Sequence, residues 1–134
     1  MSQRATGAFD VTLAPQAPDP GFEDVGVGRR TIDKQFRGDL SGTSKGQMLA
    51  VMTAVKGSAG YVAMEVVTGT LAGRSGTFAL QHSGTMTRGQ PGLLVTVVPD
   101  SGTGGLAGLT GQMNIIITDG KHFYEFDYAI DQPA

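Results

Sequence analysis

The chain has 134 residues, a formal net charge of −2, 16% charged residues and no cysteine. This length predicts a single domain over 1–134, and the near-neutral charge speaks against nucleic-acid or membrane-surface partners. The lack of cysteine excludes disulfides, thiol nucleophiles and zinc–thiolate sites. Because the N-terminal segment lacks the apolar stretch of a signal peptide and no apolar run is long enough to span a membrane, we expect a cytoplasmic protein.

Short alternating segments, separated by Gly, Pro, Asp and Ser, predict an all-β chain. The expected strands are 5–14, 27–38, 44–55, 61–71, 76–87, 92–99, 111–118 and 122–130. Eight antiparallel strands with tight connections predict a closed up-and-down β-barrel or a two-sheet sandwich. The low charge content favours the barrel, which has no edge strands to protect and whose interior is either filled or holds one small ligand.

The connections between these strands differ in character. Segment 15–26 carries three prolines, so we expect a surface loop there or a lid over one end of the fold. The segments 56–60 and 88–92 are rich in glycine and are expected to be turns.

Basic residues gather loosely over the second and third expected strands and alternate with acidic ones. They are Arg29, Arg30, Lys34, Arg37 and Lys45, with Asp33 and Asp39 among them. This mixture is typical of a solvated face and not of a nucleic-acid-binding patch. The methionines of the neighbouring strands, Met48, Met52 and Met64, are expected in the core or in subunit contacts.

The segment 61–86 reads as a hairpin whose turn lies within 71–76. A loop of two residues (Gly73 and Arg74) or of four gives one register, in which Glu65 lies directly opposite His82. A loop of three or five residues would shift that register by one and break the pairing. The apolar face of this hairpin, with Tyr61 and Phe78, is expected inside the barrel together with Glu65 and His82.

The segment 113–128 is a second hairpin, because Asp119-Gly120 is a strong two-residue turn signal. Thr118 should pair with Lys121. One face of this hairpin is plainly apolar and aromatic, so we expect it inside. Its members are Met113, Ile115, Ile117, His122, Tyr124, Phe126 and Tyr128. We therefore expect Tyr61, Phe78, His122, Tyr124, Phe126 and Tyr128 to contact a ligand if the barrel holds one.

The Glu65–His82 pair has two interpretations. A buried carboxylate needs a partner, and a histidine opposite it would satisfy that need in a purely structural role. Alternatively, the pair is an acid/base or ligand-orienting couple in a cavity, where burial shifts pKa values toward neutrality. Both interpretations stay open on the sequence, and Glu65 and His82 are the candidate catalytic residues.

Other motifs are weak. Gly102, Gly104 and Ala107 follow an apolar strand in a spacing similar to a dinucleotide fingerprint, but the glycines after them prevent the helix that such a site needs. The histidines and carboxylates show no metal-ligand spacing. Ser83 is next to His82 on a strand and faces the opposite side, so the two do not form a nucleophile–base pair. No cofactor or metal is expected.

Three segments, "GSAGYVAMEVVTGTLAGRSGTFALQHSGTM" (57–86), "VVPDSGTGGLAGLTGQM" (97–113) and "DGKHFYEFDY" (119–128), resemble a bacterial family of unknown function with the allene oxide cyclase-like barrel fold. "GTGGLAGLTG" also resembles the glycine-rich strand entry of allene oxide cyclases and dirigent proteins. The resemblance implies an eight-stranded barrel. Relatives with this barrel bind apolar molecules and steer cyclisation or coupling, and no catalytic residue is carried over from them to this chain.

Two functions follow as hypotheses. The first is a barrel that binds a small apolar molecule, with an isomerase or cyclase activity that works by confinement and uses Glu65 and His82 as acid and base. The second is a non-catalytic ligand carrier, or an oligomeric scaffold with a filled barrel. An apolar outer face at Val62, Met64 and Val66 leads us to expect a homo-oligomer.

Overall fold

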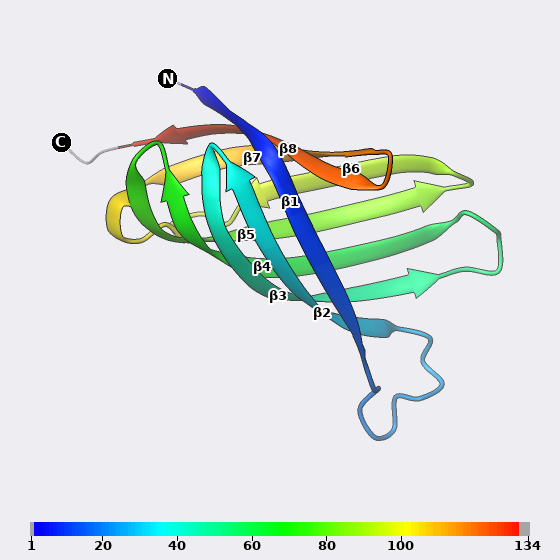
Figure 1. The fold of residues 1–134 in the computed structure, drawn as a ribbon. Helices are drawn as coiled ribbons and strands as arrows, with labels where there is room; N and C mark the ends of the chain where they lie inside the picture. The colour runs from blue at the N-terminus through cyan, green and yellow to red at the C-terminus, as the bar shows by residue number, and fades with distance from the viewer. Residues whose placement is uncertain (1, 132–134) are drawn as a thin grey trace.

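The computed structural model describes residues 2–131 and shows a closed barrel of eight antiparallel strands. The strands are β1 (Gln3–Gln16), β2 (Gly28–Gly38), β3 (Leu40–Met52), β4 (Ala59–Leu71), β5 (Arg74–Thr87), β6 (Gln90–Val97), β7 (Leu109–Thr118) and β8 (Lys121–Ile130). Each strand pairs with the next one along the chain, and β8 closes the barrel against β1 (Figure 1). The predicted all-β barrel is therefore confirmed.

Alternation of side chains separates the inside of the barrel from the outside. In β4, for example, Ala63, Glu65 and Val67 are buried while Val62 and Met64 are exposed. The period of two places every second residue of each strand on the inner face. In both hairpins the residues predicted to face inward are on the inner side of the barrel wall.

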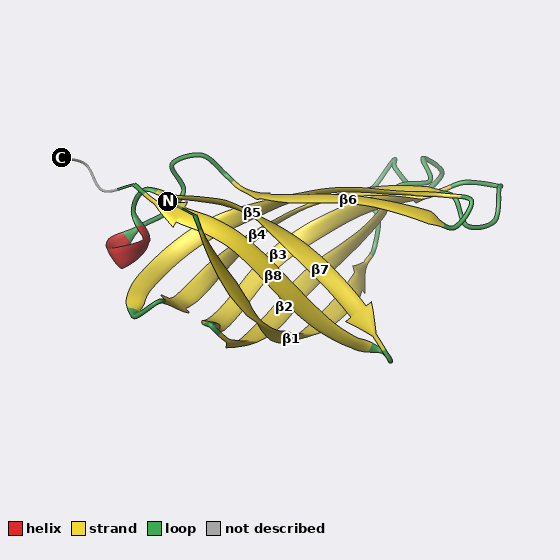
Figure 2. Ribbon diagram, turned by 90° about the horizontal axis from the view of Figure 1, so that it is seen from above, coloured by secondary structure: helices red, strands yellow, loops and turns green. Residues whose placement is uncertain are grey.

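The 3-10 turn η1 (Gly104–Leu106) lies at one end of the barrel (Figure 2), against the start of β5 at Arg74 and Ser75. This end is packed. Its core contains Leu40, Leu71, Phe78, Leu106, Leu109 and Phe126, each no more than 1% exposed. The Gly102–Ala107 segment thus covers an end of the barrel and does not begin an α-helix.

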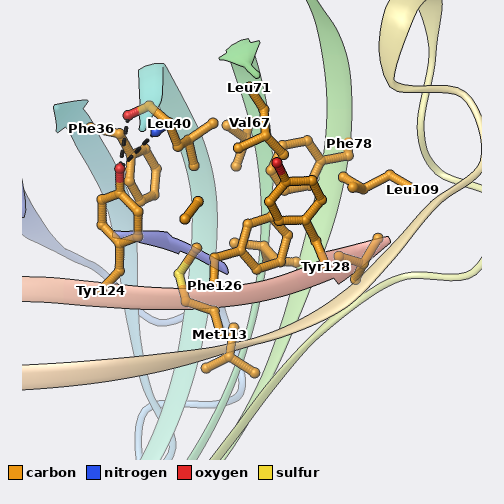
Figure 3. Packing of buried hydrophobic residues seen from close by; sticks show 14 of the residues in the cluster. Phe36, Leu40, Val67, Leu71, Phe78, Leu109, Met113, Tyr124, Phe126 and Tyr128 are labelled. Atoms are coloured by element: carbon orange, nitrogen blue, oxygen red, sulfur yellow. Dashed lines mark hydrogen bonds between the residues drawn. The ribbon is translucent and has the colours of Figure 1, made fainter. Parts of the chain in front are cut away.

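Tyr124 joins the core to the backbone of the β2–β3 turn (Figure 3). Its hydroxyl accepts a hydrogen bond from the Leu40 amide at 2.8 Å and lies 2.9 Å from the Arg37 carbonyl and 3.1 Å from the Leu40 carbonyl. Burial raises the pKa of Tyr124, which keeps the hydroxyl protonated as a donor. The inward-facing aromatic side chain therefore also satisfies buried backbone groups.

The seam between β6 and β7 is the weak part of the barrel wall. Only Thr96 and Gln112 are paired across it, whereas β5 and β6 pair continuously from Leu80↔Val97 to Thr87↔Gln90. Away from the packed end the two strands diverge (Figure 2). Pro91 is in the diverging part of β6, where its missing N–H donor removes no ladder bond.

The irregular segment after β1 is shorter than expected, because β1 runs on through Pro15, which pairs with Arg30. The remaining residues 17–27 form an exposed loop that extends away from the barrel (Figure 1). Phe22 and Val25 in this loop are 59% and 58% exposed.

Candidate functional site

The end of the barrel opposite η1 contains a cavity of about 500 Å³. Aliphatic and aromatic side chains supply most of its wall. They include Phe9, Val11, Ile32, Met48, Ala50, Tyr61, Ala63, Ile115 and His122. Exposed apolar residues, among them Met52 at 81% and Ile117 at 66%, surround its mouth. No residue of the loop 17–27 lines this cavity.

A polar cluster lies where the cavity meets the core. We call Lys34, Ser44, Glu65 and His82 the floor cluster; these four are the buried polar side chains of the described chain. Lys34 and His82 line the cavity, whereas Glu65 is fully buried and lies beneath them. The floor cluster therefore presents a lysine and a histidine to the cavity, with their carboxylate partner behind them.

Glu65 is the hub of the floor cluster. The Nζ atom of Lys34 donates to its carboxylate, at 3.1 Å from Oε1 and 3.0 Å from Oε2, and the Ser44 hydroxyl lies 3.4 Å from Oε2. Burial raises the pKa of Glu65, but the interactions with His82 and Lys34 outweigh it and hold the pKa below its ordinary value. Glu65 is therefore an ionised, fully paired carboxylate.

His82 connects Glu65 to Tyr61. Its Nε2 atom is 3.5 Å from Oε1 of Glu65, which is outside hydrogen-bond geometry. Its Nδ1 atom is 3.4 Å from the Tyr61 hydroxyl. Burial, and then the charge of Glu65, raises the pKa of Tyr61, so the hydroxyl keeps its proton. Glu65, His82 and Tyr61 thus lie in a row from the floor to the cavity wall.

The expected contact between Glu65 and His82 is present, but the expected register is wrong. The β4–β5 turn is Ala72-Gly73, so Leu71 pairs with Arg74, Glu65 faces Leu80, and His82 faces Ala63. The shift of two residues preserves the faces and makes the contact diagonal. Both turn residues have positive φ, 52° and 78°, as a type I′ turn requires.

The shift also changes which glycine lies beneath an aromatic ring. The register with Glu65 opposite His82 would put Phe78 over Gly69, but Phe78 pairs with Val67. Instead Tyr61 faces Gly84, and a side chain added at Gly84 would lie 2.3 Å from the Tyr61 ring. Gly84 therefore makes the space that lets Tyr61 lie flat along the wall beside His82.

Lys34 was placed on a solvated basic face, and this prediction is wrong. Its side chain is 5% exposed and points into the barrel, with Nζ 4.8 Å from the centre of the Phe9 ring. Arg37 and Lys45, by contrast, pair with Asp10 and Asp33 on the outside. Strand parity is the signal that was missed, because Lys34 lies between the inward-facing Ile32 and Phe36.

The predicted ligand-contacting residues divide into two groups. Tyr61 and His122 line the cavity, and His82 does so as well. Phe78, Tyr124, Phe126 and Tyr128 lie in the hydrophobic core and not in the cavity wall (Figure 3). Of the expected methionines, Met48 and Met52 line the cavity, while Met64 is on the outer surface.

Neither a metal-binding cluster nor a membrane-spanning helix is found among the described residues, 2–131. No three His, Asp or Glu side chains in this range are grouped so that they could hold a metal ion. No helix in it is long and apolar enough to cross a membrane.

The fold and the site together define a small antiparallel barrel that is packed at one end and hollow at the other, with a buried ion pair between the two halves. The model of a protein family of unknown function, DUF3224, matches residues 5–128, and the chain belongs to this family. A crystal structure of a DUF3224 protein of unknown function from Shewanella oneidensis MR-1 is similar over 99% of this chain and 100% of that one, with 50% identity and a TM-score of 0.92. No curated protein matches the sequence.

Proposed function

We propose that the barrel binds one small apolar molecule in its cavity. The observation that carries this proposal is an apolar cavity of about 500 Å³ that ends on a buried polar cluster. Ligand sites in proteins have volumes of this order, with mostly apolar walls and a few polar groups that orient the ligand. In this proposal the packed half keeps the barrel rigid and the hollow half holds the ligand.

The test uses Nile red, a neutral apolar dye whose fluorescence rises in apolar surroundings. Ala50 lines the cavity, and its neighbour Val51 is 44% exposed on the outer face. We expect the wild-type protein and Val51→Phe to bind the dye, and Ala50→Phe to bind it much more weakly because its ring takes up space inside the cavity. Failure of the wild-type protein to bind, or equal loss in both variants, would contradict the proposal.

Proton transfer, as in an isomerase or cyclase, is a second candidate function. It is favoured by the row from Glu65 through His82 to Tyr61 and by the resemblance to allene oxide cyclases. His82 would take a proton from a carbon next to a ligand carbonyl and return it at another position, while Glu65, which does not line the cavity, would orient His82.

This second candidate predicts that the protein speeds the exchange of ketone α-hydrogens with deuterated water. Mass spectrometry of methyl octyl ketone incubated with the protein would measure the incorporation. We expect the catalysed part to vanish in His82→Gln while Nile red binding persists. If the ketone took up deuterium equally with the wild-type protein and with His82→Gln, His82 would not be a catalytic base and only the binding function would stand.

A further inference from the structure

Lys34, in the cavity floor, has one N–H donor without a hydrogen-bond partner among the described residues. Both oxygens of its partner Glu65, by contrast, are already in contact with other side chains. Oε1 of Glu65 is contacted by Lys34 at 3.1 Å and by His82 at 3.5 Å, and Oε2 by Lys34 at 3.0 Å and Ser44 at 3.4 Å. A lysine ammonium has three N–H donors. Two of them serve the carboxylate, which leaves one for a further partner.

Lys34 lies at the boundary between the floor cluster and the cavity. Lys34 is itself a lining residue, and its Nζ atom lies 4.8 Å from the centre of the Phe9 ring, which also lines the cavity. Beyond the floor cluster the cavity lining is mostly apolar, and Ile32, Phe9 and Ala63 belong to it. A hydrogen bond from an ammonium in such surroundings is stronger than one in water.

The charges of the floor cluster also favour a ligand whose polar group is neutral. Glu65 already neutralises Lys34, so a ligand carboxylate would bring a second negative charge beside the first one in a buried place. Burying a charge without its own partner is costly. A neutral acceptor avoids this cost. The ammonium is also not a nucleophile while it is paired, which favours a hydrogen bond over a covalent bond to the ligand.

We infer that the cavity selects neutral apolar molecules that carry a carbonyl oxygen, such as ketones or esters, and that Lys34 Nζ donates a hydrogen bond to this oxygen. Lys34 is then the specificity-determining residue of the site. This inference rests on the proposed binding function and adds the chemical class of the ligand.

Three competitors of similar length separate the possibilities in displacement of Nile red from the full-length protein. They are methyl octyl ketone, undecane and decanoate. We expect the ketone to displace the dye about tenfold better than the hydrocarbon, as a charge-assisted hydrogen bond implies. We expect decanoate at neutral pH to be weaker than the ketone. Equal displacement by ketone and hydrocarbon, or stronger displacement by decanoate, would overturn the inference.

Variants show whether Lys34 is the residue responsible. Lys34→Met alone leaves Glu65 buried without its main partner, so the matched variant is Lys34→Met combined with Glu65→Gln. We expect this double variant to bind Nile red and to lose the preference for ketone over hydrocarbon, whereas Glu65→Gln alone keeps it. A preference that survives in the double variant would assign the carbonyl to another residue. If the wild-type protein did not bind Nile red at all, that result would instead refute the proposed function.

Discussion

Glu65 has more than one partner, and this changes what each substitution in the floor cluster should do. Lys34 contacts both carboxylate oxygens at 3.0–3.1 Å, whereas His82 contacts one at 3.5 Å. Lys34 is therefore the stronger partner. Sequence reasoning placed His82 in that role, because the lysine was expected outside.

Lys34→Met should destabilise the protein by about 3–5 kcal/mol, since it leaves a buried carboxylate without its main partner. His82→Ala should cost less, because Lys34 and Ser44 still contact Glu65. Replacing both Lys34 by Met and Glu65 by Leu should also cost less than Lys34→Met alone. Urea unfolding of the three variants measures the order. A larger loss in His82→Ala than in Lys34→Met would contradict it.

Glu65 should also make stability depend on pH. Because its pKa is lowered in the folded state, its contribution is complete above the ordinary glutamate pKa of about 4.3 and is lost as the pH falls through the lowered value. Glu65→Gln should therefore flatten the decline of unfolding free energy on acidification. Asp33→Asn, which removes an exposed carboxylate paired with Lys45, is the control. An unchanged slope in Glu65→Gln would show that Glu65 is not the group responsible.

At the level of single elements, the β4–β5 turn shows a local conflict. Ala72 has a φ of 52°, in the left-handed region that costs a residue with a Cβ atom about 1–2 kcal/mol. The equivalent position in the β7–β8 turn is Asp119, which tolerates this conformation better. Ala72-Gly73 is therefore a type I′ turn with a suboptimal first residue.

Ala72→Asn should stabilise the protein by about 1 kcal/mol, because Asn-Gly is a preferred type I′ sequence. Ala72→Val should destabilise it, since a β-branched residue is poorly tolerated at positive φ. Thermal unfolding of both variants tests the turn assignment. If Asn at this position lowered the melting temperature, the turn would lie elsewhere in the segment 71–76.

This turn also shows how far the sequence could predict the fold. The eight strands, the barrel and the inner faces follow from alternation and from turn residues, which are local signals. The register of β4 against β5 depends on which two residues form the turn, and Ala72-Gly73 is a weaker signal than Asp119-Gly120. The cavity depends on side chains from many strands at once. The sequence could therefore predict which residues face the inside of the barrel, but not where the inside is hollow.

The β6–β7 seam should be visible in amide hydrogen exchange. The residues flanking a two-residue turn form a hydrogen-bonded pair, and the pattern then alternates along each strand. The amides of Leu93, Ile115 and Ile117 accordingly point toward the seam, where only Thr96 and Gln112 pair. We expect them to exchange much faster than their neighbours Leu94 and Ile116. If the two sets of amides exchanged at equal rates, β6 and β7 would be hydrogen-bonded along the seam in solution.

On the scale of the whole molecule, we propose that two or more copies associate through the outer face of β4. Val62, Met64 and Val66 are 52%, 49% and 54% exposed there, and Leu49 of β3 pairs with Val62. An apolar surface of this kind is typical of protein–protein contacts. The cavity opens at the end of the barrel, so association through its side would leave the mouth free.

Light scattering should give a mass at least twice the 13.9 kDa of one chain. Met64→Glu should reduce it to the monomer mass, while Thr68→Glu, on the same face toward the packed end, should not. A single mass of 13.9 kDa for the wild-type protein at working concentration would rule out this association.

The order of strands has a consequence for synthesis of the chain. Seven of the eight strand pairs join neighbours in sequence, and the eighth joins the first strand to the last, from Gln3↔Tyr128 to Phe9↔His122. At the usual elongation rates, roughly ten seconds pass between the emergence of β1 and that of β8. Throughout that time β1 keeps one edge unpaired, on a nascent sheet whose apolar inner face is still uncovered. Of the eight strands, β1 is thus synthesised first and yet becomes fully paired only when β8 arrives, and that interval is when this barrel most needs protection from other chains.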